Sequence, residues 1–93
     1  METFVTIIEQ RALQSRQYQD NQGQTRTFHS RGFVLSNGID EFYAEMTGDA
    51  ALQCQEYDKT LLHSFQGYAR QRRFTDKNGV ERFENQFYIV KLV

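Results

Sequence analysis

The chain has 93 residues, a formal net charge of −1 and a single cysteine. This length allows one domain with a modest core, and the charge balance excludes a uniformly basic surface. One cysteine excludes an intrachain disulfide, and no apolar run approaches the ~20 residues of a membrane span. Since there is no signal-peptide pattern either, we expect a cytoplasmic protein that does not enter membranes.

The first third of the chain favours β-structure. Val5 to Tyr18 begins with β-branched residues and then becomes polar, which predicts one long, bent strand with a bulge. Residues 20–24 predict a turn, and Arg26 to Ser36 predicts a second strand. Gly32 inside this strand indicates a bend or a close approach of backbone. Asn37-Gly38 then predicts a tight hairpin turn.

The middle of the chain predicts a third strand and one short helix. Ile39 to Thr47 alternates, so that Phe42, Ala44 and Met46 would face the core. Asp49 is a suitable N-cap for a helix over about residues 49–58. Acidic residues concentrate over 37–60, at Asp40, Glu41, Glu45, Asp49, Glu56 and Asp58.

The last third predicts a hairpin. Leu61 to Phe74 and Val80 to Val93 are the fourth and fifth strands, and Asp76 to Gly79 is the turn between them. Near its end the fifth strand is apolar on both faces, with Phe83, Phe87 and Ile89 on one and Tyr88, Val90 and Leu92 on the other. We therefore expect one face in the core and the other at a subunit interface of a homo-oligomer, a dimer or a tetramer.

Five strands with a helix between the third and the fourth follow the order of the oligonucleotide-binding (OB) barrel. We therefore predict an all-β fold, a five-stranded OB-fold Greek-key barrel, with residues 1–93 as one domain. Such barrels bind ligands on strands 2 and 3 and between the loops that follow strands 1 and 4.

Two hairpins carry the same alternation of basic and aromatic residues. One face of the fourth strand presents Tyr68, Arg70, Arg72 and Phe74, and the spacing of Arg72, Phe74, Asp76, Gly79 and Arg82 recurs at Arg16, Tyr18, Asp20, Gly23 and Arg26. Guanidinium groups neutralise phosphates, and aromatic rings stack on unpaired bases. This pattern predicts two fingers that grip one ligand. The alternative is that both stretches are solvated hairpins, and that the shared residues only favour turn formation.

The run from Gly67 to Phe83 resembles the bacterial and phage single-stranded DNA-binding protein family. In that family the stretch reads as glycine, arginines, an aromatic, an Asp-x-x-Gly turn and an arginine–aromatic pair. Gly48 and Glu56-Tyr57 are also similar, and the resemblance extends from about Phe42 to Val90. It implies base stacking by Phe74, and by Phe42 as a weaker candidate.

The chain also departs from that family. The glycine that follows the family's first apolar strand has no counterpart near residues 7–13, and the long hairpin between the second and third strands is reduced to Asn37-Gly38. Because the sequence stops at Val93, we expect the family's acidic C-terminal tail, which recruits other proteins, to be missing.

Enzyme motifs are absent from the sequence. There is no glycine-rich phosphate loop, metal-ligand spacing or nucleophile motif. We interpret His29 and His63 as strand residues, Cys54 as a small core residue on the helix and Asp40-Glu41 as solvated charge. We therefore expect no catalytic site, no metal site, no cofactor and no enzymatic activity.

The sequence predicts binding of single-stranded DNA without sequence specificity, in replication, recombination or mobile-element transfer; RNA remains open. The alternative is a small OB-fold protein-interaction module of a replication-restart (primosomal) type, in which the acidic segment meets a protein partner. Arginines would contact phosphates and aromatic rings would stack on bases. The expected contact residues are Arg16, Tyr18, Arg26, Phe28, Tyr43, Tyr68, Arg70, Arg72, Phe74 and Arg82.

Overall fold

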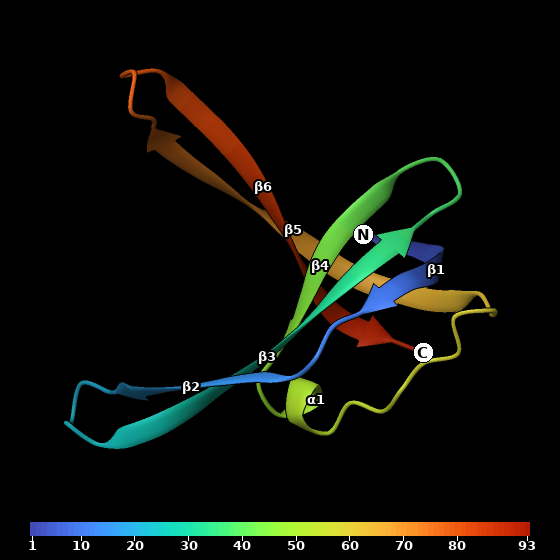
Figure 1. The fold of residues 1–93 in the computed structure, drawn as a ribbon, viewed down its shortest axis with the longest axis horizontal. Helices are drawn as coiled ribbons and strands as arrows, with labels where there is room; N and C mark the ends of the chain where they lie inside the picture. Colours follow the sequence, from blue (N-terminus) through green and yellow to red (C-terminus); the bar gives the residue numbers. More distant parts are fainter.

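The structure is a computed structural model that describes residues 1–93, and it consists mainly of β-strands. The strands form one six-stranded sheet in the order β1-β5-β6-β4-β3-β2 (Figure 1). The predicted all-β fold is confirmed. In chain order the elements are β1 (Glu2–Gln10), β2 (Gln14–Gln19), β3 (Thr25–Ser36), β4 (Glu41–Thr47), α1 (Asp49–Leu52), β5 (His63–Thr75) and β6 (Glu81–Leu92).

The sheet closes into a ring because β1 pairs with both β3 and β5. The ring continues through the antiparallel pairs β3–β4 and β5–β6 and the parallel pair β4–β6. β2 pairs with β3 outside this ring. The predicted single strand from Val5 to Tyr18 is in fact two strands, β1 and β2, separated by residues 11–13. The predicted bulge is present, since the β1–β3 register shifts between Ile7 and Glu9.

Alternating side chains of the ring strands fill the core. Val5, Phe33 and Phe65 are fully buried, as expected for residues that point inward from three different strands. Ala44 and Met46 are buried as the alternation of β4 predicts, and Phe42 packs against the core. The ring centroid of Phe42 lies 5.6 Å from that of Phe65, so its main contacts are with core residues.

The helix is shorter than predicted. α1 ends at Leu52, and Gly48, with φ of 71°, takes the N-cap position that we predicted for Asp49. The prediction of helix beyond residue 52 is wrong, because tertiary hydrogen bonds hold the following segment in an irregular path. The amide N–H of Tyr57 donates to Oε1 of Gln10 at 3.0 Å, a contact that a helix over this segment would not need.

A bulge near the end of β6 changes which side chains face the core. The β5–β6 register shifts between Gln66 and Gly67, which leaves Val90 without a partner on β5. Beyond this bulge Leu92 points into the core, as Ile89 does before it. The predicted position of Leu92 on the face opposite Ile89 is therefore wrong, because both side chains are buried in the core.

Two hairpins extend beyond the ring (Figure 1). We call residues 14–30 the β2–β3 finger and residues 68–86 the β5–β6 finger; both lie at the left of the view, the first below and the second above. α1 is the one helix, and it has neither the length nor the apolarity to cross a membrane.

Candidate nucleic-acid interface

The tip of the β2–β3 finger is organised by one carboxylate. Oδ1 of Asp20 accepts hydrogen bonds from the backbone N–H groups of Gln22 and Gln24, at 2.9 and 3.0 Å. Its Oδ2 accepts a hydrogen bond of 2.6 Å from Nε of Arg26. Gly23, between Gln22 and Gln24, has φ of 76°, which side-chain-bearing residues rarely adopt. The hydrogen bond from Arg26, with those of the backbone, lowers the pKa of Asp20.

The tip of the β5–β6 finger repeats this arrangement. Oδ1 of Asp76 accepts from the N–H groups of Asn78 and Val80, at 2.9 and 3.0 Å, and Oδ2 accepts from Nε of Arg82 at 2.6 Å. Gly79 has φ of 75°. The Arg82 hydrogen bond, followed by those of the backbone, lowers the pKa of Asp76. The recurrence of Asp, Gly and Arg in the sequence thus corresponds to two equivalent finger tips.

The two tip arginines therefore have a structural role that the sequence hypothesis did not include. Arg26 and Arg82 were predicted as phosphate contacts, yet each uses Nε to hold the turn beside it. Their side chains remain 57% and 60% exposed, so the terminal NH₂ groups are still accessible to an anion. Each can hold its tip and meet a phosphate at the same time.

The cross-strand register places all the predicted contact residues on one face of the sheet. Residues opposite each other on paired strands share a face, and so do residues two positions apart. One row crosses β3, β4, β6 and β5 and joins the two fingers; it contains Gly32, Glu45, Tyr88 and Tyr68. We call this surface the candidate face; it carries Arg16, Tyr18, Arg26, Phe28, Tyr43, Tyr68, Arg70, Arg72, Phe74, Arg82 and Tyr88.

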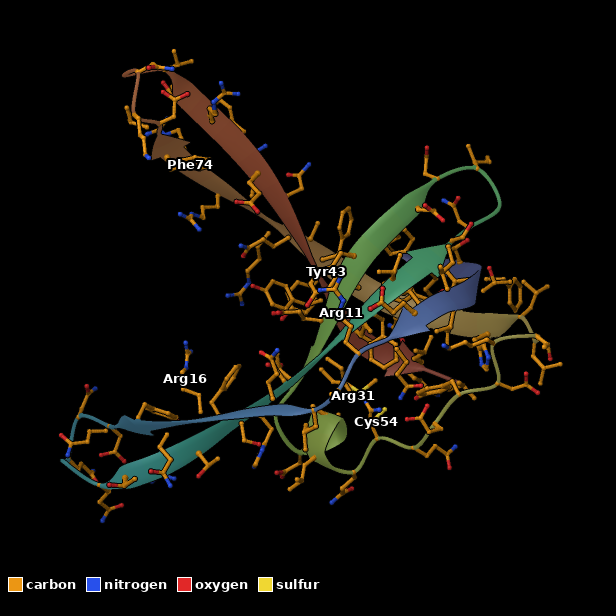
Figure 2. The ribbon with its side chains drawn as sticks, in the orientation of Figure 1. Arg11, Arg16, Arg31, Tyr43, Cys54 and Phe74 are labelled. Atoms are coloured by element: carbon orange, nitrogen blue, oxygen red, sulfur yellow. The ribbon has the colours of Figure 1, made fainter.

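Figure 2 shows how this face is oriented. Arg16 on the β2–β3 finger points into the space between the fingers, and Phe74 lies on the β5–β6 finger. Tyr43 and Arg11 lie where the two fingers meet the ring. The candidate face is therefore the inner surface of a V formed by the two fingers.

Arginines lie over aromatic rings on both fingers. The guanidinium carbon of Arg16 is 5.7 Å from the ring centroid of Phe28, and that of Arg72 is 5.1 Å from the centroid of Phe74. Such cation–π contacts hold the guanidinium groups beside the rings. Each finger thus presents a phosphate-binding group next to a stacking surface.

A stacked tyrosine pair lies at the base of the β5–β6 finger. The rings of Tyr68 and Tyr88 are 5.4 Å apart at an interplanar angle of 25°, and Arg70 lies 5.5 and 5.8 Å from their centroids. Tyr88 was missed by the sequence argument. It could have been found by pairing the two strands about the Asp76–Gly79 turn, since the register that places Phe74 opposite Arg82 also places Tyr68 opposite Tyr88.

Tyr43 lies across the backbone of β3 at Gly32. A Cβ atom at Gly32 would come within 2.7 Å of two Tyr43 ring carbons, so this glycine makes room for the Tyr43 side chain, whereas the sequence predicted a bend or a close approach of backbone. The guanidinium of Arg11, which was not predicted, lies 5.3 Å from the Tyr43 ring centroid. Burial and the neighbouring carboxylate of Glu45 raise the pKa of Tyr43. The phenol is therefore neutral at physiological pH.

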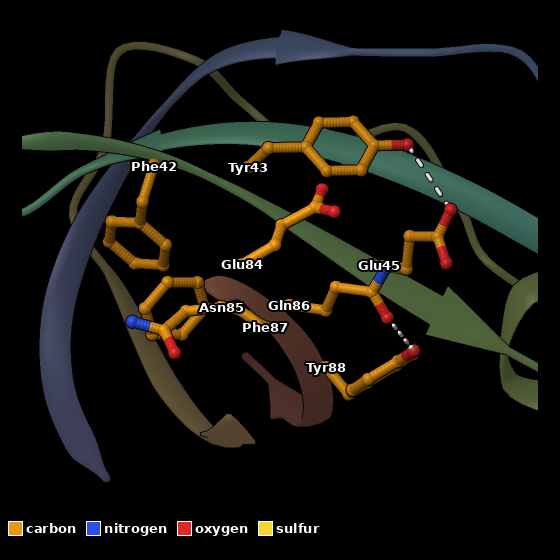
Figure 3. A pocket seen from close by; sticks show the side chains of 8 residues that line it. All are labelled: Phe42, Tyr43, Glu45, Glu84, Asn85, Gln86, Phe87 and Tyr88. Atoms are coloured by element: carbon orange, nitrogen blue, oxygen red, sulfur yellow. Dashed lines mark hydrogen bonds between the residues drawn. The ribbon is translucent and has the colours of Figure 1, made fainter. Parts of the chain in front are cut away.

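Two adjoining cavities hollow the candidate face. The larger, of about 400 Å³, lies between β4 and β6 and is shown in Figure 3. The smaller, of about 320 Å³, lies at the base of the β2–β3 finger, beside Arg16 and Phe28. Glu45 lines both, so the two cavities lie beside the same side chain.

Of the residues that we interpreted as structural, all but Cys54 have the expected positions. His29 and His63 lie in β3 and β5, and both Asp40 and Glu41 are exposed. Cys54 lies just beyond α1, not on it; it packs against the core, and burial raises the pKa of its thiol. No group of three or more His, Cys, Asp or Glu side chains is placed to hold a metal ion.

Comparison of the chain with protein-family models, with curated proteins and with solved structures finds no match. Support for a function therefore comes from the candidate face itself. A surface with guanidinium groups beside exposed rings can bind a flexible polyanion that carries planar groups.

Proposed function

We propose that the chain is an OB-fold protein that binds single-stranded DNA without marked sequence specificity, as members of the single-stranded DNA-binding protein family do. The observation that carries this proposal is the register, which gathers the arginines and aromatic rings of both fingers on one face. The OB assignment is supported by the order of pairing. β4 and β6 are parallel neighbours, α1 lies between β4 and β5, and the fingers occupy the loop positions at which OB barrels bind.

The two kinds of side chain favour a single strand over a duplex. Stacking on Tyr18, Phe28 or Phe74 requires bases whose faces are free, and a base-paired duplex offers none along its length. Arg16, Arg72 and their neighbours would meet the phosphates between these bases. Because every base has a stacking face, this mode of binding is largely indifferent to sequence.

The charge of the chain makes binding depend on local arginines. The net charge of −1 provides no long-range attraction for a polyanion. Affinity must therefore come from contacts on the candidate face and should fall as salt rises, because each neutralised phosphate releases counterions.

The test is fluorescence anisotropy with labelled oligothymidylate of about 16 nucleotides, the upper end of OB-fold site sizes. We expect binding at low salt that weakens steeply with added salt, and a large loss of affinity in the combined variant of Arg16→Ala, Arg70→Ala and Arg72→Ala. Oligouridylate of equal length measures the DNA-versus-RNA preference. Tighter binding of a duplex of equal length would overturn the proposal. Failure to bind any oligonucleotide at any salt concentration would favour the protein-interaction alternative.

A further inference from the structure

The larger cavity on the candidate face has a defined structural origin. β4 and β6 pair only at Ala44–Phe87 and Glu45–Tyr88, and then diverge as the β5–β6 finger leaves the ring. We call the cavity that opens there the notch. Its volume of about 400 Å³ lies toward the lower end of the roughly 300–1,000 Å³ range of small-ligand pockets. A single planar group of nucleobase size fits such a space.

Aromatic rings form one end of the notch. Phe42 and Phe87 lie with ring centroids 5.3 Å apart, and Tyr43 and Tyr88 line the walls beside them (Figure 3). These rings present flat apolar surfaces to any group that enters. The notch therefore suits a planar heterocycle better than a sugar or a phosphate.

Carboxylates form the other end. Figure 3 shows the carboxylate of Glu84 between the Tyr43 ring and the side chain of Gln86, with Glu45 beside them. Oε1 of Glu45 accepts a hydrogen bond of 3.4 Å from the Tyr43 hydroxyl, which leaves Oε2 able to accept another. Glu84 has no ion-pair partner in the chain. Ionised carboxylates only accept hydrogen bonds, and they repel phosphate.

We propose that the notch takes one unstacked base of the bound strand and prefers guanine. This inference rests on the proposed function. It adds one base-selective position to a surface that otherwise binds any base. Guanine presents N1–H and the N2 amino group as adjacent donors, which match the two oxygens of a carboxylate. Adenine and cytosine present one amino group next to an acceptor nitrogen. Thymine presents N3–H between two carbonyl oxygens, which a carboxylate repels.

The placement of charge also gives the path of the strand. Arg72 lies directly opposite Glu84 on the β5–β6 finger, and Arg16 and Glu45 line the smaller cavity together, so arginines flank the carboxylates of the notch on both sides. Phosphates are attracted to these arginines and repelled by the carboxylates inside the notch. The strand crossing from one finger to the other therefore turns a base, and not its backbone, toward the ring.

The experiment compares oligothymidylates of about 16 nucleotides that carry one central guanine, adenine, cytosine, thymine or hypoxanthine. Hypoxanthine is guanine without the N2 amino group and should fall between guanine and thymine. A bidentate contact to one base discriminates by roughly 1–3 kcal/mol, and the notch is partly open, so we expect guanine to bind about fivefold to tenfold more tightly than thymine.

Charge variants identify the groups that read the base. Glu84→Gln and Glu45→Gln should each reduce the guanine preference to less than about twofold while binding of plain oligothymidylate persists. Glu81→Gln is the matched control, because it removes the same charge from the same finger but on the opposite face, where Glu81 pairs with Arg73 at 3.4 Å. It should retain the guanine preference. Circular dichroism melting of each variant confirms that it folds.

The outcomes separate this inference from the proposed function. Equal affinity for all central bases, a preference for another base, or a guanine preference that survives both Glu→Gln variants would overturn the notch proposal while oligothymidylate binding stands. Absence of oligothymidylate binding by the unmodified protein at low salt would overturn both.

Discussion

Nε of Arg82 donates a hydrogen bond of 2.6 Å to Oδ2 of Asp76, six residues earlier in the chain. The other oxygen of this carboxylate accepts two N–H groups of the turn, so one side chain closes the tip of the β5–β6 finger. Asp20 and Arg26 do the same in the β2–β3 finger. Since most side chains of both fingers are exposed, these networks, together with the ladder hydrogen bonds, hold the tips in shape.

We expect Asp76→Ala to loosen the tip of its finger without unfolding the ring, because Asp76 makes its contacts only within the turn and with Arg82. Amide hydrogen exchange at residues 77–80 should accelerate, and the melting temperature should change little. Lys77→Ala is the control, since it changes the same turn and leaves the carboxylate network intact. Unchanged exchange in Asp76→Ala would show that the network does not hold the tip.

The stability of the finger tips should depend on pH only in the acid range. Hydrogen bonds from Arg82 and Arg26 are the main cause of the lowered pKa values of Asp76 and Asp20. A folded-state pKa below the ordinary value, about 3.9, means that the contribution to stability is complete above that value. It is lost as pH falls through the lower folded-state pKa. Carboxyl-carbon NMR titration measures both midpoints, and a midpoint at or above 3.9 for Asp76 would be the contrary result.

Removal of a stacking ring should affect affinity more than stability. We expect Phe74→Ala to weaken binding of oligothymidylate by roughly 1–3 kcal/mol, the usual contribution of one base–ring stack. The salt dependence should remain nearly unchanged, because no phosphate contact is lost. Phe83→Ala is the control on the opposite face of the same finger. If Phe74→Ala instead lowers the melting temperature and leaves affinity intact, Phe74 has a packing role.

Removal of a phosphate contact should produce the complementary result. Arg72→Ala should weaken binding and also reduce the slope of log affinity against log salt by about 0.7, the value per phosphate for a single strand. Arg73→Ala changes the charge equally on the other face and should leave the slope nearly constant. Equal slope changes in the two variants would indicate that only net charge matters.

Gly32 and Tyr43 should behave as a coupled pair. Gly32→Ala places a Cβ within 2.7 Å of the Tyr43 ring carbons, so we expect a destabilisation of about 1–3 kcal/mol from overpacking. In the background of Tyr43→Ala the same change should cost much less. Thermal or urea unfolding of the four proteins gives the coupling energy. Additive effects would show that the ring of Tyr43 does not lie across Gly32 in solution.

We expect the chain to form a homo-oligomer, and we expect the replacement of Phe4 to weaken this assembly most. Phe4 and Val93 flank Ser64 in one row across the outer face of the ring, and they are 66% and 64% exposed. Multi-angle light scattering should give a dimer or a tetramer at micromolar concentration, and Phe4→Ser should shift it toward monomer. A monomer of the unmodified chain under these conditions would exclude this assembly.

The features that the sequence determined by itself are local. Asp76, Gly79 and Arg82 lie within one turn, and their hydrogen bonds and positive φ require no distant partner, so both finger tips could be predicted from spacing. The faces of β4 and β5 follow from alternation, which depends only on the pleat of the strand. Alternation thus places the predicted contact residues of one strand on one face, whereas the register between strands joins the strands into a single face.

The tertiary structure alone decided the features that join distant residues. The end of α1 depends on Tyr57 reaching Gln10, 47 positions earlier, and this contact outweighs a weak local preference for helix. The burial of Leu92 depends on a register shift between two strands, which alternation within one strand cannot indicate. The notch exists because β4 and β6 pair over a short length and then separate. The closure of the ring determines how long the two strands remain paired. Ring closure depends on packing among all the strands at once, and no short stretch of sequence encodes it.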